Sequence, residues 1–148
     1  MSIMFSLLFI SVLTLAEEKE KLVENPNIME MHQIANEKRG KCKQCKRPPL
    51  ELDEECCQMA QEWANHMVKV GKRYHGKNDQ IISSGYKDTP AAFSAWMNSS
   101  GHRAWILTRK CTKAGWGYQV SEKGTNYWVG VFRLKLEIEL LLMIMKAE

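Results

Sequence analysis

The sequence lacks any run of roughly 20 apolar residues, the length that a membrane-spanning helix needs, and this excludes a polytopic membrane protein. It also lacks internal repeats, low-complexity linkers and a strong charge of one sign. The 21 Lys and Arg residues against 17 Asp and Glu residues leave a net charge of +4, which permits attraction to anionic surfaces without indicating nucleic-acid binding. What is present, 148 residues with 45% hydrophobic side chains and five Trp, is typical of one globular domain.

The first 16 residues contain no charged side chain. Residues 3–15 are mostly apolar, and the small residue Ala16 stands directly before Glu17. This pattern predicts a secretory signal peptide over residues 1–16 with cleavage near Ala16, and hence a secreted protein, extracellular or periplasmic. Only the amino terminus supplies positive charge at this end, so a buried N-terminal strand or helix and an uncleaved membrane anchor remain alternatives.

The five cysteines are an odd number for an exported chain, in which most should form disulfides. Cys42 and Cys45 have the spacing of half a zinc site, but a complete site needs a second pair at that spacing. Cys56 and Cys57 are adjacent instead, and neighbouring side chains on a helix point about 100° apart. We therefore favour a disulfide over a zinc site, either between Cys42 and Cys45 or from one of them to Cys56 or Cys57. Cys111 is the fifth cysteine.

Helical patterns come first along the chain and strand patterns follow. The apolar spacing and the capping residues predict helices from Asn25 to Gly40, from Asp53 to Gly71 and from Asp88 to Asn98, and one more apolar turn at residues 105–107. Trp63 and Trp96 lie on the apolar stripes of these helices, so we expect both in the core. Residues 115–120 and 125–132 are strand-like runs separated by a Gly-containing turn, which predicts a β-hairpin.

The tail over residues 133–148 combines two patterns. Leu134, Leu136, Ile138 and Leu140 alternate with charged residues, whereas residues 141–145 are apolar throughout. Alternation favours a strand and a continuous apolar run permits a helix, so the tail is either a last strand or a short amphipathic helix.

Several short motifs occur in an order that resembles one protein family. They are NEKR at 36–39, AQEWA at 60–64, YHG at 74–76, QII at 80–82, WMNSSGHRAWIL at 96–107, AGWG at 114–117 and YWVGVF at 127–132. Together they resemble the CAP superfamily of cysteine-rich secretory, antigen 5 and pathogenesis-related proteins, also called SCP-like extracellular domains, in its compact bacterial branch. The resemblance implies an α+β fold over residues 25–132, a three-layer α-β-α sandwich around a small, mostly antiparallel sheet.

The resemblance also implies a candidate site. His75 and His102 match the two histidines of a metal-binding tetrad that contains two further acidic residues in the family. The positions that match the acids hold Gln80 and Ser99, and Asp79 beside Gln80 points to the opposite face of an extended segment. Two imidazoles without a carboxylate would bind zinc weakly. We therefore expect either no cofactor or a zinc ion that is weakly bound by His75 and His102. The alternative is a hydrogen-bonded histidine pair that ties the walls of the cleft together.

No nucleophile, base and orienting acid come together in the sequence, so we assign no catalytic residue. The favoured function is a non-catalytic binding module whose cleft, at His75, Gln80, Ser99 and His102, accepts a small or extended ligand. A metal-assisted hydrolase and a lipid or sterol carrier are the alternatives. The basic residues of loop 38–47 favour docking to lipid headgroups or a cell-surface polymer, or simply form a solvated face. This loop lacks the interleaved aromatic residues on which bases of a single-stranded nucleic acid stack, so we do not expect nucleic-acid binding. We also expect the protein to be a monomer.

Overall fold

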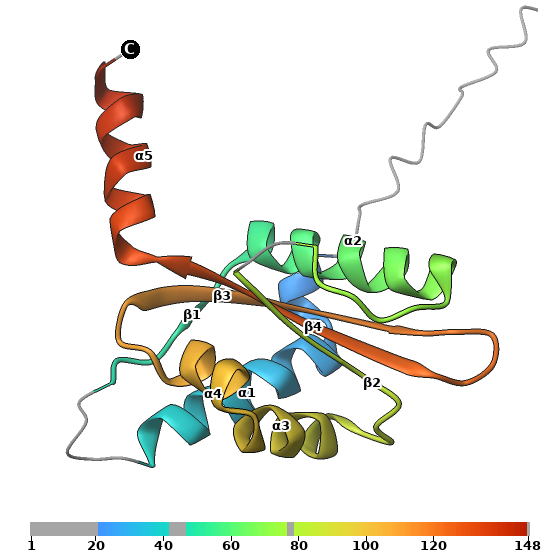
Figure 1. Cartoon of the computed structure of the whole chain (residues 1–148). Helices are drawn as coiled ribbons and strands as arrows, with labels where there is room; N and C mark the ends of the chain where they lie inside the picture. The colour runs from blue at the N-terminus through green and yellow to red at the C-terminus, as the bar shows by residue number, and fades with distance from the viewer. Residues whose placement is uncertain (1–20, 42–46, 77–78, 148) are drawn as a thin grey trace, which may run out of the picture.

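In the computed structural model, which describes residues 21–41, 47–76 and 79–147, one four-stranded sheet lies between two layers of helices (Figure 1). The strand order is β1-β3-β4-β2. The bounds are β1 (Glu51–Leu52), β2 (Gln80–Ser84), β3 (Cys111–Val120) and β4 (Asn126–Leu134). β1 pairs with β3 in parallel, and the β3–β4 and β2–β4 pairs are antiparallel. The predicted α+β sandwich with a mostly antiparallel sheet is therefore confirmed.

Helix α2 (Glu54–Val70) covers one face of the sheet by itself (Figure 1). Asp53 caps its first turn by accepting a hydrogen bond from the Cys56 N–H at 3.0 Å, and Gly71 ends it in the left-handed conformation. Close contact with β3 depends on glycine, because a Cβ atom added at Gly117 would lie 2.3 Å from the carbonyl carbon of Ala60. The helix predicted from Asp53 to Gly71 is confirmed.

Helices α1 (Pro26–Gly40), α3 (Thr89–Asn98) and α4 (Ser100–Leu107) cover the other face (Figure 1). Between them and the sheet lies an aromatic core in which Phe93 packs edge-on against Trp96, with ring centroids 4.9 Å apart. Trp116 of β3 and Phe132 of β4 complete this cluster. Trp96 is buried as predicted. Trp63 is only partly buried: it packs against the core between α2 and the sheet from its edge, and its indole N–H donates to the loop after α2.

Two residues of the NEKR motif are structural. Arg39 is buried and donates hydrogen bonds to the carbonyl oxygens of Pro48, Ile106 and Thr108 at 2.9, 2.8 and 2.8 Å, which ties α1 to the end of α4. The Asn36 side chain donates to the Leu50 carbonyl and accepts from the Leu50 N–H, so it fixes the entry to β1. Arg39 therefore does not belong to the predicted docking loop. Residues 42–46 lie outside the described residues.

The cysteines that the structure describes do not form the alternative disulfide that was expected between the 42–45 loop and Cys56 or Cys57. Cys56 and Cys57 are buried free thiols, so the alternative in which one of them bonds to the 42–45 loop is wrong. Both belong to the first turn of α2, on the side that packs against the sheet. Burial raises the pKa of the Cys56 thiol to about 12 and that of the Cys57 thiol to about 11. Cys111 is buried at the start of β3. Cys42 and Cys45 lie outside the described residues, as does the predicted signal peptide.

The tail forms a helix, α5 (Lys135–Ala147), and not a last strand. It follows β4 without a connecting loop and projects away from the sheet (Figure 1). The Lys135 N–H donates to the Lys110 carbonyl oxygen at 2.9 Å, which anchors the base of α5 to the segment before β3. Among the described residues, no helix is long and apolar enough to cross a membrane.

Candidate functional site

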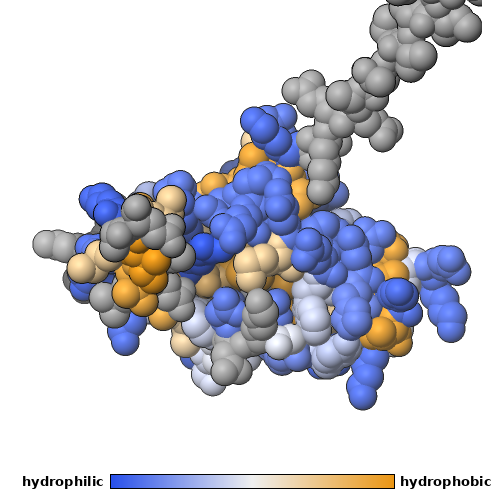
Figure 2. Space-filling view, turned by 90° about the horizontal axis from the view of Figure 1, so that it is seen from above, coloured by the Kyte–Doolittle hydropathy of each residue, from blue (hydrophilic) through white to orange (hydrophobic). Residues whose placement is uncertain are grey.

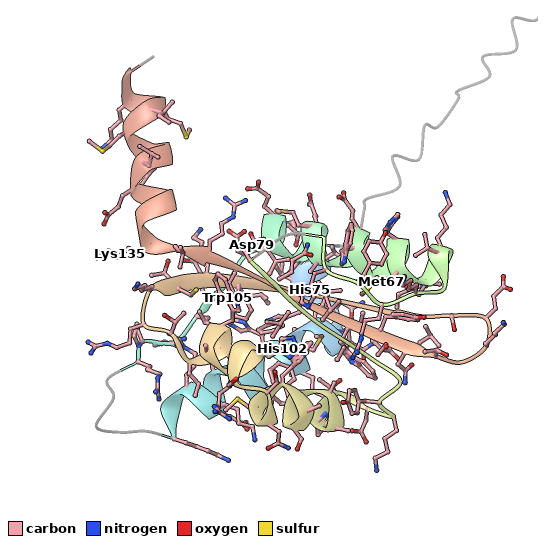
Figure 3. All side chains as sticks on the ribbon, in the orientation of Figure 1. Met67, His75, Asp79, His102, Trp105 and Lys135 are labelled. Carbon is pink, nitrogen blue, oxygen red and sulfur yellow. The ribbon has the colours of Figure 1, made fainter. Side chains whose placement is uncertain are left out.

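The structure brings His75 and His102 together from segments far apart in the sequence (Figure 3). His75 lies in the loop between α2 and β2 and is exposed, whereas His102 lies in the first turn of α4 and is half-buried. Their ring centroids are 6.0 Å apart and their planes are inclined by 31°. Burial lowers the pKa of the His102 imidazole, and electrostatic repulsion from the neighbouring His75 and Arg73 lowers it further. The structure therefore disfavours the protonated form of His102.

Gln80 supports the loop that carries His75. It is the first residue of β2 and is 5% exposed, and its side-chain oxygen accepts a hydrogen bond from the Gly76 N–H at 3.2 Å. The Trp63 indole N–H donates to the Tyr74 carbonyl oxygen at 3.0 Å on the other side of His75. Gly76 lies so close to Trp63 that an added Cβ atom would be 2.6 Å from its ring. The position of His75 therefore depends on these contacts on both sides.

Ser99 occupies a different place from the other three candidate residues. It is the N-cap residue of α4, one turn before His102, and it forms no side-chain capping hydrogen bond. It lines an open hollow of about 580 Å³ on α3, together with Tyr86, Ala91, Ser94, Ala95 and Asn98. Gln80 lines a separate cavity of about 320 Å³ with Met59, Glu62, Trp63, His66 and Gly76. Neither of these two linings includes His75 or His102, so the cleft of all four residues stays a prediction.

The donor atoms around the histidine pair do not fit a tight zinc site. Tetrahedral zinc in proteins takes three or four ligands, commonly with at least one charged side chain in structural and hydrolytic sites. Within residues 21–41, 47–76 and 79–147, no group of three or more His, Cys, Asp or Glu side chains could hold a metal ion. Gln80 is turned to the Gly76 N–H. Weak zinc binding by His75 and His102 stays a prediction.

An aromatic cluster beside this pair was not predicted from the sequence. Trp63 and His66 of α2 and Tyr74 of the following loop contact one another, with ring centroids 5.0 to 5.7 Å apart. The Tyr74 hydroxyl and the His66 Nε2 atom form a hydrogen bond. The three-residue spacing of Trp63 and His66 on one helix was a signal of a shared face. The approach of Tyr74 depends on the loop, which no helical pattern describes.

Comparisons with known proteins agree with this architecture. Residues 33–132 match the model of the CAP family, described as the cysteine-rich secretory protein family. An outer surface protein from Borrelia burgdorferi has a similar structure, with a TM-score of 0.61, 18% identity, and coverage of 70% of this chain and 89% of that one. The hookworm platelet inhibitor gives a TM-score of 0.58 at 13% identity, covering 82% of this chain and 76% of that one.

A third structure is an extracellular protein with an SCP domain from Bacillus anthracis, with a TM-score of 0.59 and 19% identity. The match covers 75% of this chain but 42% of that one, so the chain spans less than half of that protein. At these identities the solved structures show the fold alone. The comparison with curated protein sequences found no match.

Proposed function

Because the chain belongs to the cysteine-rich secretory (CAP) protein family, we propose that it is a secreted, non-catalytic binding module whose ligand contacts His75 and His102. Proteins of this family are typically secreted, and the uncharged apolar segment at residues 1–16 supports export of this chain. N-terminal sequencing of the exported protein tests the export. We expect a chain that begins near residue 17, and recovery of intact Met1 would contradict it.

The observation that carries the binding function is a pair of imidazoles with no carboxylate grouped beside them among the described residues. Hydrolysis needs a base, a group that orients it and a site that stabilises the developing oxyanion. The lowered pKa of His102 suits it as a base, but the side chains that lower this pKa beyond the effect of burial, His75 and Arg73, are basic groups and not an orienting acid. A neutral imidazole offers one N–H donor and one acceptor nitrogen, which suits a small or extended polar ligand.

Zinc titration separates this proposal from a metal-assisted hydrolase at the same histidines. Calorimetry at one pH would compare the parent, His75→Ala, His102→Ala and Gln80→Glu, with His66→Gln as the matched control. We expect weak binding in the parent, loss in either alanine variant, and no change in the control. Gln80→Glu should strengthen binding because a carboxylate adds the missing negative charge and still accepts from the Gly76 N–H.

Two outcomes would contradict the proposal. Tight binding that disappears in either alanine variant would favour the hydrolase. Tight zinc binding that is the same in the parent and in both alanine variants would place the metal elsewhere. Cys42 and Cys45 would then be the first residues to replace.

A further inference from the structure

Most of the large apolar side chains that are exposed in the described chain lie on helix α5. Five of the nine large apolar side chains that are exposed lie on it. Their exposed fractions are 60% for Leu140, 50% for Leu142, 70% for Met143, 53% for Ile144 and 70% for Met145. The other four are scattered singly over the remaining elements, as is normal for a soluble domain. In Figure 2, apolar side chains gather at the left of the molecule, where α5 rises in Figure 1.

The five exposed apolar side chains of α5 surround the helix rather than forming one stripe. At about 100° per residue, the five exposed residues between Leu140 and Met145 leave no gap around the axis wider than about 100°. A second copy of α5 or a groove on another protein would cover one side and leave the rest in water. A fluid apolar phase covers all sides, so the arrangement favours the hydrocarbon of a lipid membrane.

The base of α5 has the residues that are typical of a membrane interface. Arg109 and Lys110 are exposed there, and the Lys135 side chain is 70% exposed and forms a solvent-exposed ion pair with Glu139 at 3.8 Å. Trp105 is partly buried and lines a shallow hollow with Lys110 and Leu134. Trp prefers the boundary between headgroups and hydrocarbon, and cations bind anionic headgroups. We name Trp105, Arg109, Lys110 and Lys135 the basic collar.

From these observations we propose that α5 inserts residues 140–145 into one leaflet of an anionic lipid membrane, with the basic collar at the headgroups. The helix has 13 residues and is about 20 Å long, whereas the hydrocarbon core is about 30 Å thick. Insertion therefore enters the bilayer without crossing it. This proposal concerns a different surface from the histidine pair and does not depend on what that pair binds.

Flotation of the full chain with vesicles tests the insertion. Vesicles of phosphatidylcholine alone and of phosphatidylcholine mixed with phosphatidylglycerol would be compared for the parent and for the double variant Met143→Gln/Met145→Gln. Gln keeps the helix propensity but removes apolar surface, so the partition coefficient of this variant should fall at least about tenfold on the mixed vesicles. The matched control is Met29→Gln/Val70→Gln, which changes two side chains of 54% and 47% exposure elsewhere and should float like the parent.

The basic collar has its own variant. Arg109→Gln/Lys110→Gln should weaken flotation on the mixed vesicles and leave flotation on phosphatidylcholine alone unchanged, because headgroup attraction requires anionic lipid. A parent that does not float on the mixed vesicles, or a Met143→Gln/Met145→Gln variant that floats as well as the parent, would overturn the proposal.

Hydrogen exchange of the full chain locates the segment that meets the lipid. We expect vesicles to slow exchange over residues 135–147. Slowing confined to the first 20 residues would overturn the proposal, because the apolar N-terminal segment would then account for flotation. Sedimentation equilibrium without lipid tests a second copy. A parent dimer that the Met143→Gln/Met145→Gln variant dissociates, with exchange over residues 135–147 unaffected by vesicles, would overturn the membrane in favour of self-association.

Discussion

Helices α2 and α5 both adjoin the same sheet, but their apolar residues have opposite relations to it. The apolar residues of α2 form one stripe, and five of its residues are buried against β3 and β4. On α5, the five apolar residues whose exposure the structure describes, between Leu140 and Met145, are exposed around the helix axis, and the helix adjoins the body at its base (Figure 1). A stripe indicates a partner on one side, which the sheet of the same chain supplies for α2. An apolar surface around the whole axis has no such partner within the described fold.

The starts of the two helices differ in the same way. Asp53 caps α2, and Glu54 and Glu55 in its first turn complement the positive end of the helix dipole. α5 begins with Lys135, a cation at the end where the dipole disfavours positive charge, and has one acid, Glu137, in its first turn against the two of α2. α2 is therefore determined locally and by its packing, whereas α5 depends more on its surroundings.

The largest effect should come from truncating one methionine in each helix. Met67 of α2 is fully buried, and Met67→Ala should lower the free energy of unfolding by about 2–5 kcal/mol because it leaves a cavity under the helix. Met143 of α5 is 70% exposed, and Met143→Ala should change it by less than about 0.5 kcal/mol. Chemical denaturation of both variants measures the difference. Equal losses would show that α5 packs against the body in solution.

A smaller effect is expected where α2 touches β3. Gly117→Ala would place a Cβ atom 2.3 Å from the backbone of Ala60, and moving α2 aside should cost about 1–3 kcal/mol. Gly101→Ala is the matched control, because no atom lies within 4 Å of the added Cβ atom there. Gly101 lies in α4, so alanine should be neutral or stabilising by about 1 kcal/mol. Similar denaturation midpoints for the two variants would contradict the close approach of α2 to β3.

These contacts explain why α2 could be predicted from the sequence and α5 could not. The cap at Asp53, the apolar stripe and Gly71 all agree, so local patterns determine where α2 begins and ends. Residues 134–140 alternate like a strand, while residues 141–145 are equally compatible with a buried helix. Periodicity also gave Trp63 a core position, but the tertiary hydrogen bond to Tyr74 holds its ring at the edge.

The candidate site was predictable only as a set of residues. The motifs around His75 and His102 suggested that they come from neighbouring segments, and the two rings are 6.0 Å apart. The role of Gln80 was not predictable, because its hydrogen bond to the Gly76 N–H depends on the turn that the chain makes between His75 and β2. Arg39 was counted with a solvated loop, since its carbonyl partners come from residues that are distant in the sequence.

The cap of α2 should also make stability depend on pH. Burial alone would raise the pKa of Asp53, but hydrogen bonds from the Cys56 N–H and from Lys113 outweigh it, so the pKa lies below its ordinary value. This stabilisation is present above the ordinary carboxyl pKa of about 4 and is lost as the pH falls through the folded pKa. Asp53→Ala should cost about 1 kcal/mol at neutral pH. Chemical denaturation at a series of pH values should show that the free energy of unfolding of this variant falls less steeply toward acid pH than that of the parent.

Asp53→Asn is the control for this prediction. Asn keeps the capping oxygen and removes the charge that pairs with Lys113 at 3.2 Å. The variant should therefore retain most of the stability at neutral pH and show the same shallow acid limb as Asp53→Ala. An acid limb that both variants leave unchanged would mean that other carboxyl groups govern the acid transition.

The smallest expected effect concerns the pKa values of two histidines: His32, which is hydrogen-bonded within the fold, and His102, which lies beside the exposed His75. His32 has its partners inside the fold, since the Trp116 indole N–H donates to its Nδ1 atom at 3.2 Å. Burial lowers the pKa of His32, although a backbone contact with Leu50 opposes this. For His102, burial and then the charge of His75 lower the pKa. In an NMR titration, both should therefore titrate below the ordinary value of about 6.5.

The variant His75→Asn sharpens the contrast, because it removes a neighbouring positive charge and leaves the burial of His102 in place. We expect the pKa of His102 to rise part of the way toward its ordinary value and that of His32 to stay unchanged. The protonated form of either group is disfavoured in the folded state, so the free energy of unfolding should fall slightly below about pH 6.5. His75→Asn should reduce that fall. An unchanged His102 pKa would show that the two rings are further apart in solution and that the proposed ligand site is not formed there.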